Sequence, residues 1–146
     1  MVWRTVLVVE DGEIDAKLLE RALADKISRS AVVLVNTTTD AERYLFADGP
    51  GAGTRKGPPD LVVLNVKAPP SGGLDLLKKV RSDSRTRAIP VLAMSQELQD
   101  QDVRDLYRSG ANSYMDRPVD FQEFVSMVSA AAHYWLGLNL SAPGTR

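Results

Sequence analysis

The stretch Asp60-Leu61-Val62-Val63-Leu64-Asn65 places four consecutive apolar residues between two polar ones. A short apolar run without alternation is typical of a strand that is buried on both faces, as in a parallel sheet. Four further short runs that can form strands lie along the chain, at residues 6–9, 31–35, 90–94 and 113–115. Segments with helical periodicity lie between them and follow the last one. Each is long enough to cross over between two parallel strands.

This alternation predicts an α/β protein in which helices cover both faces of one parallel sheet. Right-handed crossovers leave few topologies, and we expect a flavodoxin-like, doubly wound sheet of five strands in the order 2-1-3-4-5, with five helices. We assign residues 1–134 to this domain and residues 135–146 to a C-terminal extension. In such a sheet the functional crevice lies beyond the carboxyl ends of the strands, beside strands 1 and 3.

The composition limits which classes of function need to be considered. The 146 residues carry a net charge of −1, so no overall field draws the chain to nucleic acid or to a membrane surface. The absence of cysteine excludes disulfides and thiolate chemistry, and His133 is the only histidine, which disfavours a zinc site. The sequence shows neither a signal peptide nor a long apolar span, so we expect a cytoplasmic protein.

Polar residues stand where the predicted strands end. Glu10 and Asp11 follow the first strand, Asn65 ends the third, Ser95 ends the fourth, and Arg117 follows the fifth. Adjacent carboxylates at a strand end suit Mg²⁺, and a nearby hydroxyl and cation would complete a pocket for a phosphoryl group. Taken alone, the acidic pair is also compatible with ordinary solvated surface charge.

The spacing of these features resembles the receiver domain of two-component response regulators, over almost the whole chain. The segments that carry the resemblance are Val8–Asp11, Asp60–Asn65 with Pro69 and Gly73 after it, Ile89–Ser95, and Gly110–Pro118. From Phe124 to Gly144 the chain is further similar to stand-alone response regulators that are associated with phytochromes. The resemblance therefore implies a signalling module of the phosphorelay type.

The resemblance also implies a role for each residue of the crevice. In the family an aspartate at the position of Asn65 accepts the phosphoryl group. Together with an acidic pair and a backbone carbonyl two residues later, it also holds Mg²⁺. Glu10, Asp11 and Lys67 occupy these metal positions. Two further positions contact the phosphoryl oxygens, and a third carries a switch aromatic; in this chain they are Ser95, Arg117 and Tyr114.

Two of these positions depart from the family pattern, and both departures bear on the chemistry. Asn65 replaces the acceptor, and a neutral amide is a very poor nucleophile toward phosphorus. Arg117 replaces a lysine, and this independent change favours natural degeneracy over an engineered block at Asn65. We hypothesise that Lys67 or Arg117 neutralises the acidic pair in place of a metal. A pair ~4 Å apart gains roughly 4 kcal/mol before desolvation. We expect no resident cofactor and at most weakened Mg²⁺ binding.

An apolar stretch continues past the expected end of the domain. Tyr134, Trp135 and Leu136, with Tyr107 of the fourth predicted helix, are candidates for a dimer or partner surface, because exposed apolar patches often mark one. The alternative is that the stretch folds back onto the core of its own domain. Regulators that resemble this chain tend to form pairs, which favours a homodimer.

Together these features predict a stand-alone pseudo-receiver that is not an enzyme and acts by phosphorylation-independent protein binding. Its expected partner is a histidine kinase, such as a bacteriophytochrome, or another response regulator. Two alternatives stay open. One is a sensor of a small anion or ligand, with Lys67 and Arg117 as donors; the other is phosphotransfer on Asp11 or another nearby carboxylate.

Overall fold

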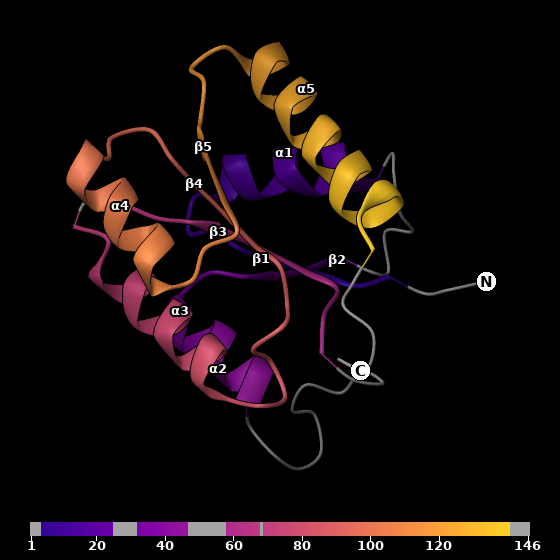
Figure 1. The fold of residues 1–146 in the computed structure, drawn as a ribbon. Coiled ribbons are helices and arrows are strands. Elements are labelled where there is room, and N and C mark those ends of the chain that lie inside the picture. The colour runs from indigo at the N-terminus through magenta and orange to yellow at the C-terminus, as the bar shows by residue number, and fades with distance from the viewer. Residues whose placement is uncertain (1–3, 25–31, 47–57, 68, 141–146) are drawn as a thin grey trace.

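The computed structural model describes residues 4–24, 32–46, 58–67 and 69–140. Its centre is one parallel sheet in the order β2-β1-β3-β4-β5, which confirms the predicted flavodoxin-like topology (Figure 1). The strands are β1 (Val6–Val9), β2 (Val32–Val35), β3 (Leu61–Asn65), β4 (Val91–Ser95) and β5 (Ser113–Asp116).

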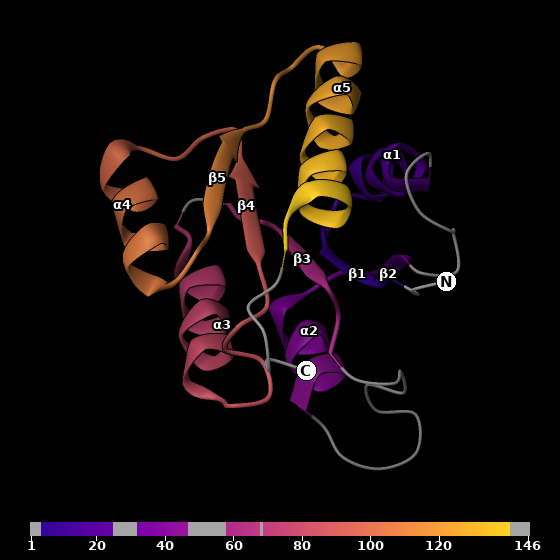
Figure 2. The same cartoon turned by 45° about the vertical axis from the view of Figure 1, so that its right-hand side comes forward.

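Helices cover both faces of this sheet, as predicted. One face carries α1 (Glu13–Ala24) and α5 (Phe121–Ala132), which lie side by side in both views (Figures 1 and 2). The other face carries α2 (Thr38–Phe46), α3 (Ser71–Ser82) and α4 (Asp100–Ser109). After α5 the chain continues as a π-helical turn, η2 (His133–Leu138).

The continuous apolar runs of the sequence are explained by two cores, one on each face. In β1, Leu7 and Val9 point to the core under α2, α3 and α4, while Val6 and Val8 point to the core under α1 and α5. All four side chains are buried. Side chains that alternate along a strand need to be apolar at every position only when both faces of the sheet are covered.

The amino ends of β4 and β5 are held by one arginine from the end of α3. Arg81 donates hydrogen bonds of 2.6–2.9 Å to four oxygens, those of Gly110 O, Arg87 O, Ile89 O and Asn112 Oδ1. Asn112 Oδ1 also accepts from the backbone N–H of Val91 at 2.7 Å. The arginine therefore joins α3, the end of α4 and the start of β5 in one network.

Gly110 ends α4 in a conformation that this network requires. Its φ is 121°, in the region that side chains other than glycine's rarely adopt. A Cβ at this position would lie 2.5 Å from Cγ of Arg81. A side chain is thus excluded both by the backbone angle and by the arginine packed against it.

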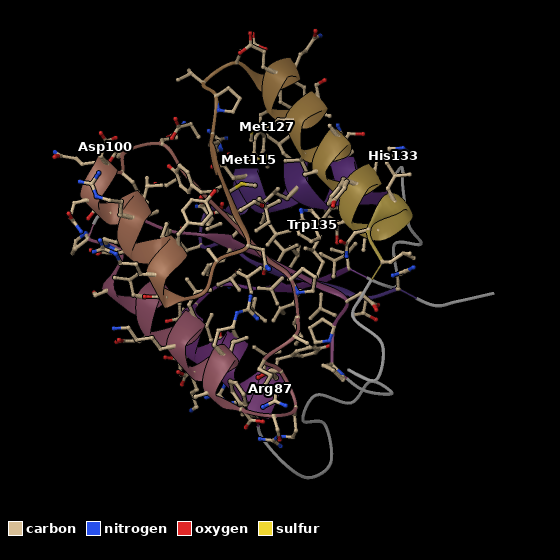
Figure 3. All side chains as sticks on the ribbon, viewed as in Figure 1. Arg87, Asp100, Met115, Met127, His133 and Trp135 are labelled. Carbon is tan, nitrogen blue, oxygen red and sulfur yellow. The ribbon has the colours of Figure 1, made fainter. Side chains whose placement is uncertain are left out.

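The apolar stretch after α5 divides between the core and the surface. Leu136 is 8% exposed and belongs to the core under α1 and α5, and Trp135 packs partly against that core from the inner side of the helix (Figure 3). Tyr134 and Leu138 are exposed. Leu136 therefore packs onto the core of its own domain, which was the alternative expectation. Its assignment to an exposed partner surface is wrong, because the chain continues helically after α5 and turns this side chain inward. Residues 141–146 of the predicted extension lie outside the described residues.

No helix among the described residues is both long and apolar enough to span a bilayer.

Candidate functional site

The carboxyl ends of the strands and the loops after them line an open crevice of about 390 Å³. The crevice brings together all of the predicted pocket residues, which are Glu10, Asp11, Asn65, Lys67, Ser95 and Arg117. It adds two carboxylates that the sequence analysis did not single out, Asp15 and Glu97. Four carboxylates and two cations therefore face one another at the position expected for the site.

Glu10 lies at the bottom of this constellation, 3% exposed. Its Oε2 accepts a hydrogen bond of 2.8 Å from the N–H of Gly12, while Oε1 is buried without a hydrogen-bond partner among the described residues. Burial raises the pKa of Glu10, and the charge of Asp15 adds to this effect. The bond from Gly12 and the side chain of Asn65 act in the opposite direction. Burial thus makes the charged form of this carboxylate costly.

Lys67 supplies the cation that was predicted for the acidic pair. Its Nζ lies 3.0 Å from Oδ2 of Asp11. The hydrogen bond from Lys67 lowers the pKa of Asp11, and the same contact raises the pKa of Lys67. Both side chains are at least half exposed, so solvent screens the pair and its contribution to stability is small.

Of the two cations that were alternatives for the acidic pair, Lys67 contacts it, whereas Arg117 pairs with a different carboxylate. Its guanidinium donates through Nη2 to Oδ1 of Asp15 and lies over the ring of Phe124, with Cζ 4.3 Å from the ring centroid. The loop after β5 runs directly into α5, so the arginine comes to rest on the first turn of that helix and beside α1. Asp15 lies in the first turn of α1, and the spacing of the predicted strand ends does not single it out.

The hydroxyl and the switch aromatic lie on the β4–β5 side of the crevice. Ser95 is buried, and its Oγ accepts from the N–H of Glu97 at 3.3 Å. The Tyr114 hydroxyl donates to Asp116 Oδ1 at 2.8 Å and lies 3.3 Å from the carbonyl oxygen of Ser95. Burial, followed by Asp116, raises the pKa of Tyr114. Tyr107 accepts from the N–H of Tyr114 through its own hydroxyl at 3.0 Å, which links α4 to β5.

The oxygen ligands of the crevice are of the type that Mg²⁺ prefers, but Asp11 is already engaged by another partner. Glu10, Asp11, the Asn65 amide oxygen and the Lys67 carbonyl would hold the ion, and the unpartnered Oε1 of Glu10 would gain a ligand. Asp11, however, is paired with the Lys67 ammonium. Among the described residues no group of three or more acidic, histidine or cysteine side chains could hold a metal. Binding would therefore compete with the lysine.

Comparison with known proteins shows to which family the chain that carries this crevice belongs. The model of the response regulator receiver domain matches residues 6–129. The chain belongs to this family. Receiver domains work with histidine kinases in two-component signalling. They promote phosphoryl transfer to themselves rather than act as ordinary enzymes.

Relatives with known names and structures agree with this assignment. A probable methanogenesis regulatory protein, FilR2 of Methanothrix harundinacea, is 31% identical over 140 residues, which cover 95% of this receiver and 87% of the relative. The phosphorylated cyanobacterial phytochrome response regulator RcpA is similar with a TM-score of 0.85 and 26% identity, over 96% of this receiver and 99% of that chain. The bacteriophytochrome response regulator RtBRR is 32% identical with a TM-score of 0.67, over 99% and 87%. Two response regulators of Arabidopsis thaliana also match, but only over 55% of their own length.

Proposed function

We propose that this chain is a stand-alone pseudo-receiver, which acts in the cytoplasm by binding other signalling proteins and is not switched by phosphorylation. The observation that supports this is the position of Asn65. It ends β3 and lines the crevice beside Glu10 and Asp11, where the family resemblance implies an acceptor carboxylate. Its amide has no anionic oxygen with which to attack phosphorus, so the covalent step of the family has no acceptor here.

The charges of the crevice support the same conclusion. Lys67 is engaged by Asp11 and Arg117 by Asp15, so each cation that faces the crevice already has a carboxylate partner. A phosphoryl group or another small anion would have to displace one of these carboxylates. The pairing thus weakens the alternative of an anion sensor, which needs Lys67 and Arg117 as donors.

The partners follow from the family and its neighbours. A histidine kinase is the expected class of partner, and the likeness to RcpA and RtBRR supports a kinase of the phytochrome type. We also propose a homodimer that uses the exposed rings of Tyr107 in α4 and Tyr134 in η2, since exposed apolar groups often mark a partner surface.

The acceptor proposal is tested by incubating the native chain with acetyl phosphate and Mg²⁺ and measuring its intact mass. The expected mass is unchanged, because Asn65 cannot accept the group. A gain of one phosphoryl group on the native chain, on Asp11 or any other carboxylate, contradicts the proposal. A bacterial receiver with an intact acceptor serves as the positive control for the donor.

The metal part of the proposal has its own test. Mg²⁺ titration of the native chain, followed by tryptophan fluorescence or by amide shifts in NMR spectra, should show binding weaker than millimolar. Lys67→Ala frees Asp11 and should strengthen the affinity by roughly threefold to tenfold, which corresponds to a surface ion pair of about 1 kcal/mol. Lys78→Ala, an exposed cation of α3 outside the crevice, is the matched control. Millimolar or tighter binding to the native chain contradicts the internal pairing.

The partner proposal is tested with a purified bacteriophytochrome kinase. Its affinity for the native chain should be the same with and without acetyl phosphate. Light scattering after size exclusion measures the oligomeric state. Tyr134→Glu should shift a dimer to monomer, whereas Gln122→Glu, an exposed change in the first turn of α5, should not. A monomeric native chain contradicts the dimer.

A further inference from the structure

We propose that Asp15 is a positioning residue that holds Arg117 away from the phosphoryl-binding part of the crevice and so forms a second barrier to phosphorylation. This inference rests on the proposed function, since it concerns the same crevice. It differs from it because the barrier would persist after an acceptor carboxylate had been restored at position 65. The first barrier is chemical and lies in one amide, whereas the second is electrostatic and lies in an ion pair between α1 and the β5–α5 loop.

The contacts of Arg117 fix its guanidinium in one place. The side chain is 13% exposed and is held from two sides, by the carboxylate of Asp15 and by the face of the Phe124 ring at 4.3 Å. Phe124 is itself 1% exposed, in the core under α1 and α5. A guanidinium that left for a phosphoryl group would lose both the charge pair and the aromatic contact. The arginine is therefore part of the packing between α1 and α5.

The same ion pair adds negative charge where a phosphoryl group would have to enter. Asp15 lines the crevice together with Glu10, Asp11 and Glu97. Its charge acts on Glu10, whose pKa it helps to raise. A phosphoryl group carries further negative charge, so each of these carboxylates opposes its approach. Removing the charge of Asp15 would lower this repulsion and release a cation in one step.

The chemistry shows why the released arginine matters. In an Asn65→Asp variant, an oxygen of the introduced carboxylate would attack the phosphorus of acetyl phosphate. The new O–P bond forms as the bond from phosphorus to the acetyl oxygen breaks, and acetate leaves with the bonding pair. The charge on the three phosphoryl oxygens then needs donors. The Ser95 hydroxyl lines the crevice, but Lys67 is paired with Asp11 and Arg117 is bound to Asp15.

The test compares four variants that all carry Asn65→Asp. The first has no other change, the second adds Asp15→Asn, the third adds Asp15→Glu, and the fourth adds Asp75→Asn. Asp75 is an exposed carboxylate of α3 outside the crevice, so the fourth variant controls for the change of net charge. Initial rates of phosphorylation are measured by intact mass over a range of acetyl phosphate concentrations with Mg²⁺. Circular dichroism and urea unfolding confirm that each variant is folded.

Asp15→Asn should increase the rate at low donor concentration on the order of tenfold over Asn65→Asp alone. The gain should appear as a lower half-saturating donor concentration, since the freed guanidinium binds phosphoryl oxygens. Asp15→Glu keeps the charge and the partner of Arg117, so its rate should stay low. Asp75→Asn should change nothing. A purely structural role of Asp15 predicts instead that Asn and Glu disturb the rate alike.

Equal rates within about twofold for the first two variants overturn the proposal, as does a gain in the Glu variant that matches the gain in the Asn variant. A folded Asn variant that remains inert overturns it as well. If Asp15→Asn prevents folding, Asp15→Ser in the same background provides the second measurement, with the same gain expected. Phosphorylation of the native chain would instead overturn the proposed function, whatever the Asp15 variants do.

Discussion

Two arginines hold opposite ends of the sheet, and they do so in different ways. Arg81, at the amino ends of β4 and β5, donates to four neutral oxygens, three of them backbone carbonyls. Arg117, at the carboxyl ends, binds the charged carboxylate of Asp15 and the ring of Phe124. Its Nε is buried without a hydrogen-bond partner in the described part of the chain. Each guanidinium nitrogen of Arg81 donates at least one hydrogen bond, whereas Arg117 Nε donates none to the described residues.

The difference shows where this receiver buries polar atoms that lack a hydrogen-bond partner. In the network around Arg81, each of the four acceptor oxygens receives a hydrogen bond from the guanidinium, so the network contributes to stability. At the carboxyl end, Arg117 Nε and Glu10 Oε1 have no hydrogen-bond partner within the described ranges, and each buried unpaired polar atom costs about 1–3 kcal/mol. Proteins tolerate such costs mainly where a site requires the groups to be present. Both atoms belong to residues that line the crevice, where the proposed function places the site.

The largest expected effect separates the two arginines directly. Arg81→Met removes donors from four oxygens in a partly buried seam, so we expect a loss of about 4 kcal/mol in the free energy of unfolding. Arg117→Met also removes an unpaired buried donor and should cost only about 1 kcal/mol. Urea unfolding measures both. Equal losses would remove the distinction between a structural and a functional arginine.

The next effect tests the geometry that surrounds Arg81. Gly110→Ala forces a side chain into a backbone with φ of 121° and against the arginine, which should cost about 3 kcal/mol. Gly72→Ala is the matched control, since its Cβ would meet Thr38 Oγ1 at 3.4 Å. It lies in the first turn of α3 and should shift stability by less than about 0.5 kcal/mol. A well-tolerated alanine at Gly110 would show that the network around Arg81 adjusts more easily than its contacts indicate.

A smaller effect, of opposite sign, belongs to the crevice. Burial raises the pKa of Glu10 above its ordinary value of 4.5, so the folded chain binds the proton more tightly than the unfolded chain. Ionised Glu10 therefore destabilises the fold above its raised pKa, and this cost disappears as the pH falls toward 4.5. Glu10→Gln should stabilise the chain at neutral pH on the order of 1 kcal/mol.

The pH dependence of that gain is the decisive part of the measurement. Urea unfolding of the native chain and of Glu10→Gln at a series of pH values should show two curves that converge in acid. A gain that stays constant at all pH values would mean that the glutamine acts through packing rather than through charge.

The smallest effect lies on the surface, far from the crevice. The Arg85 guanidinium lowers the pKa of Asp83 to about 2, with a nitrogen–oxygen distance of 2.9 Å. A depressed pKa contributes stability above the unfolded value of 3.8 and loses it as the pH falls toward about 2. An NMR titration of the Asp83 carboxyl should give this low value, and Arg85→Gln should return it toward 3.8. An unshifted titration in the native chain would contradict the contact.

The sequence predicted the sheet because the relevant signal is local. Residues 61–64 are apolar at every position, and only a strand covered on both faces requires this. The end of the last helix was harder to predict, because Leu136 and Leu138 are equally apolar in sequence. Their difference arises from the phase of η2, which turns Leu136 to the core and leaves Leu138 exposed. That phase depends on packing and not on composition.

The residues that line the crevice could be predicted, but the ion pairs between them could not. Glu10, Asn65, Ser95 and Arg117 end or follow strands, and a parallel sheet brings such positions together. Which carboxylate takes which cation depends on the direction of long side chains, and this is not encoded in strand spacing. Asp15 was missed for that reason. The position of α1 against α5 brings Asp15, and not the acidic pair, into contact with Arg117.

The side chain of Asn112 has a consequence for how this domain opens. Its amide oxygen accepts from the N–H of Val91 as well as from Arg81, so the first amide of β4 is protected by the side chain of the residue just before β5. Hydrogen exchange at Val91 therefore reports on the detachment of β5 rather than on fraying of β4 itself. A single amide signal in this receiver can thus measure how often its last strand leaves the sheet.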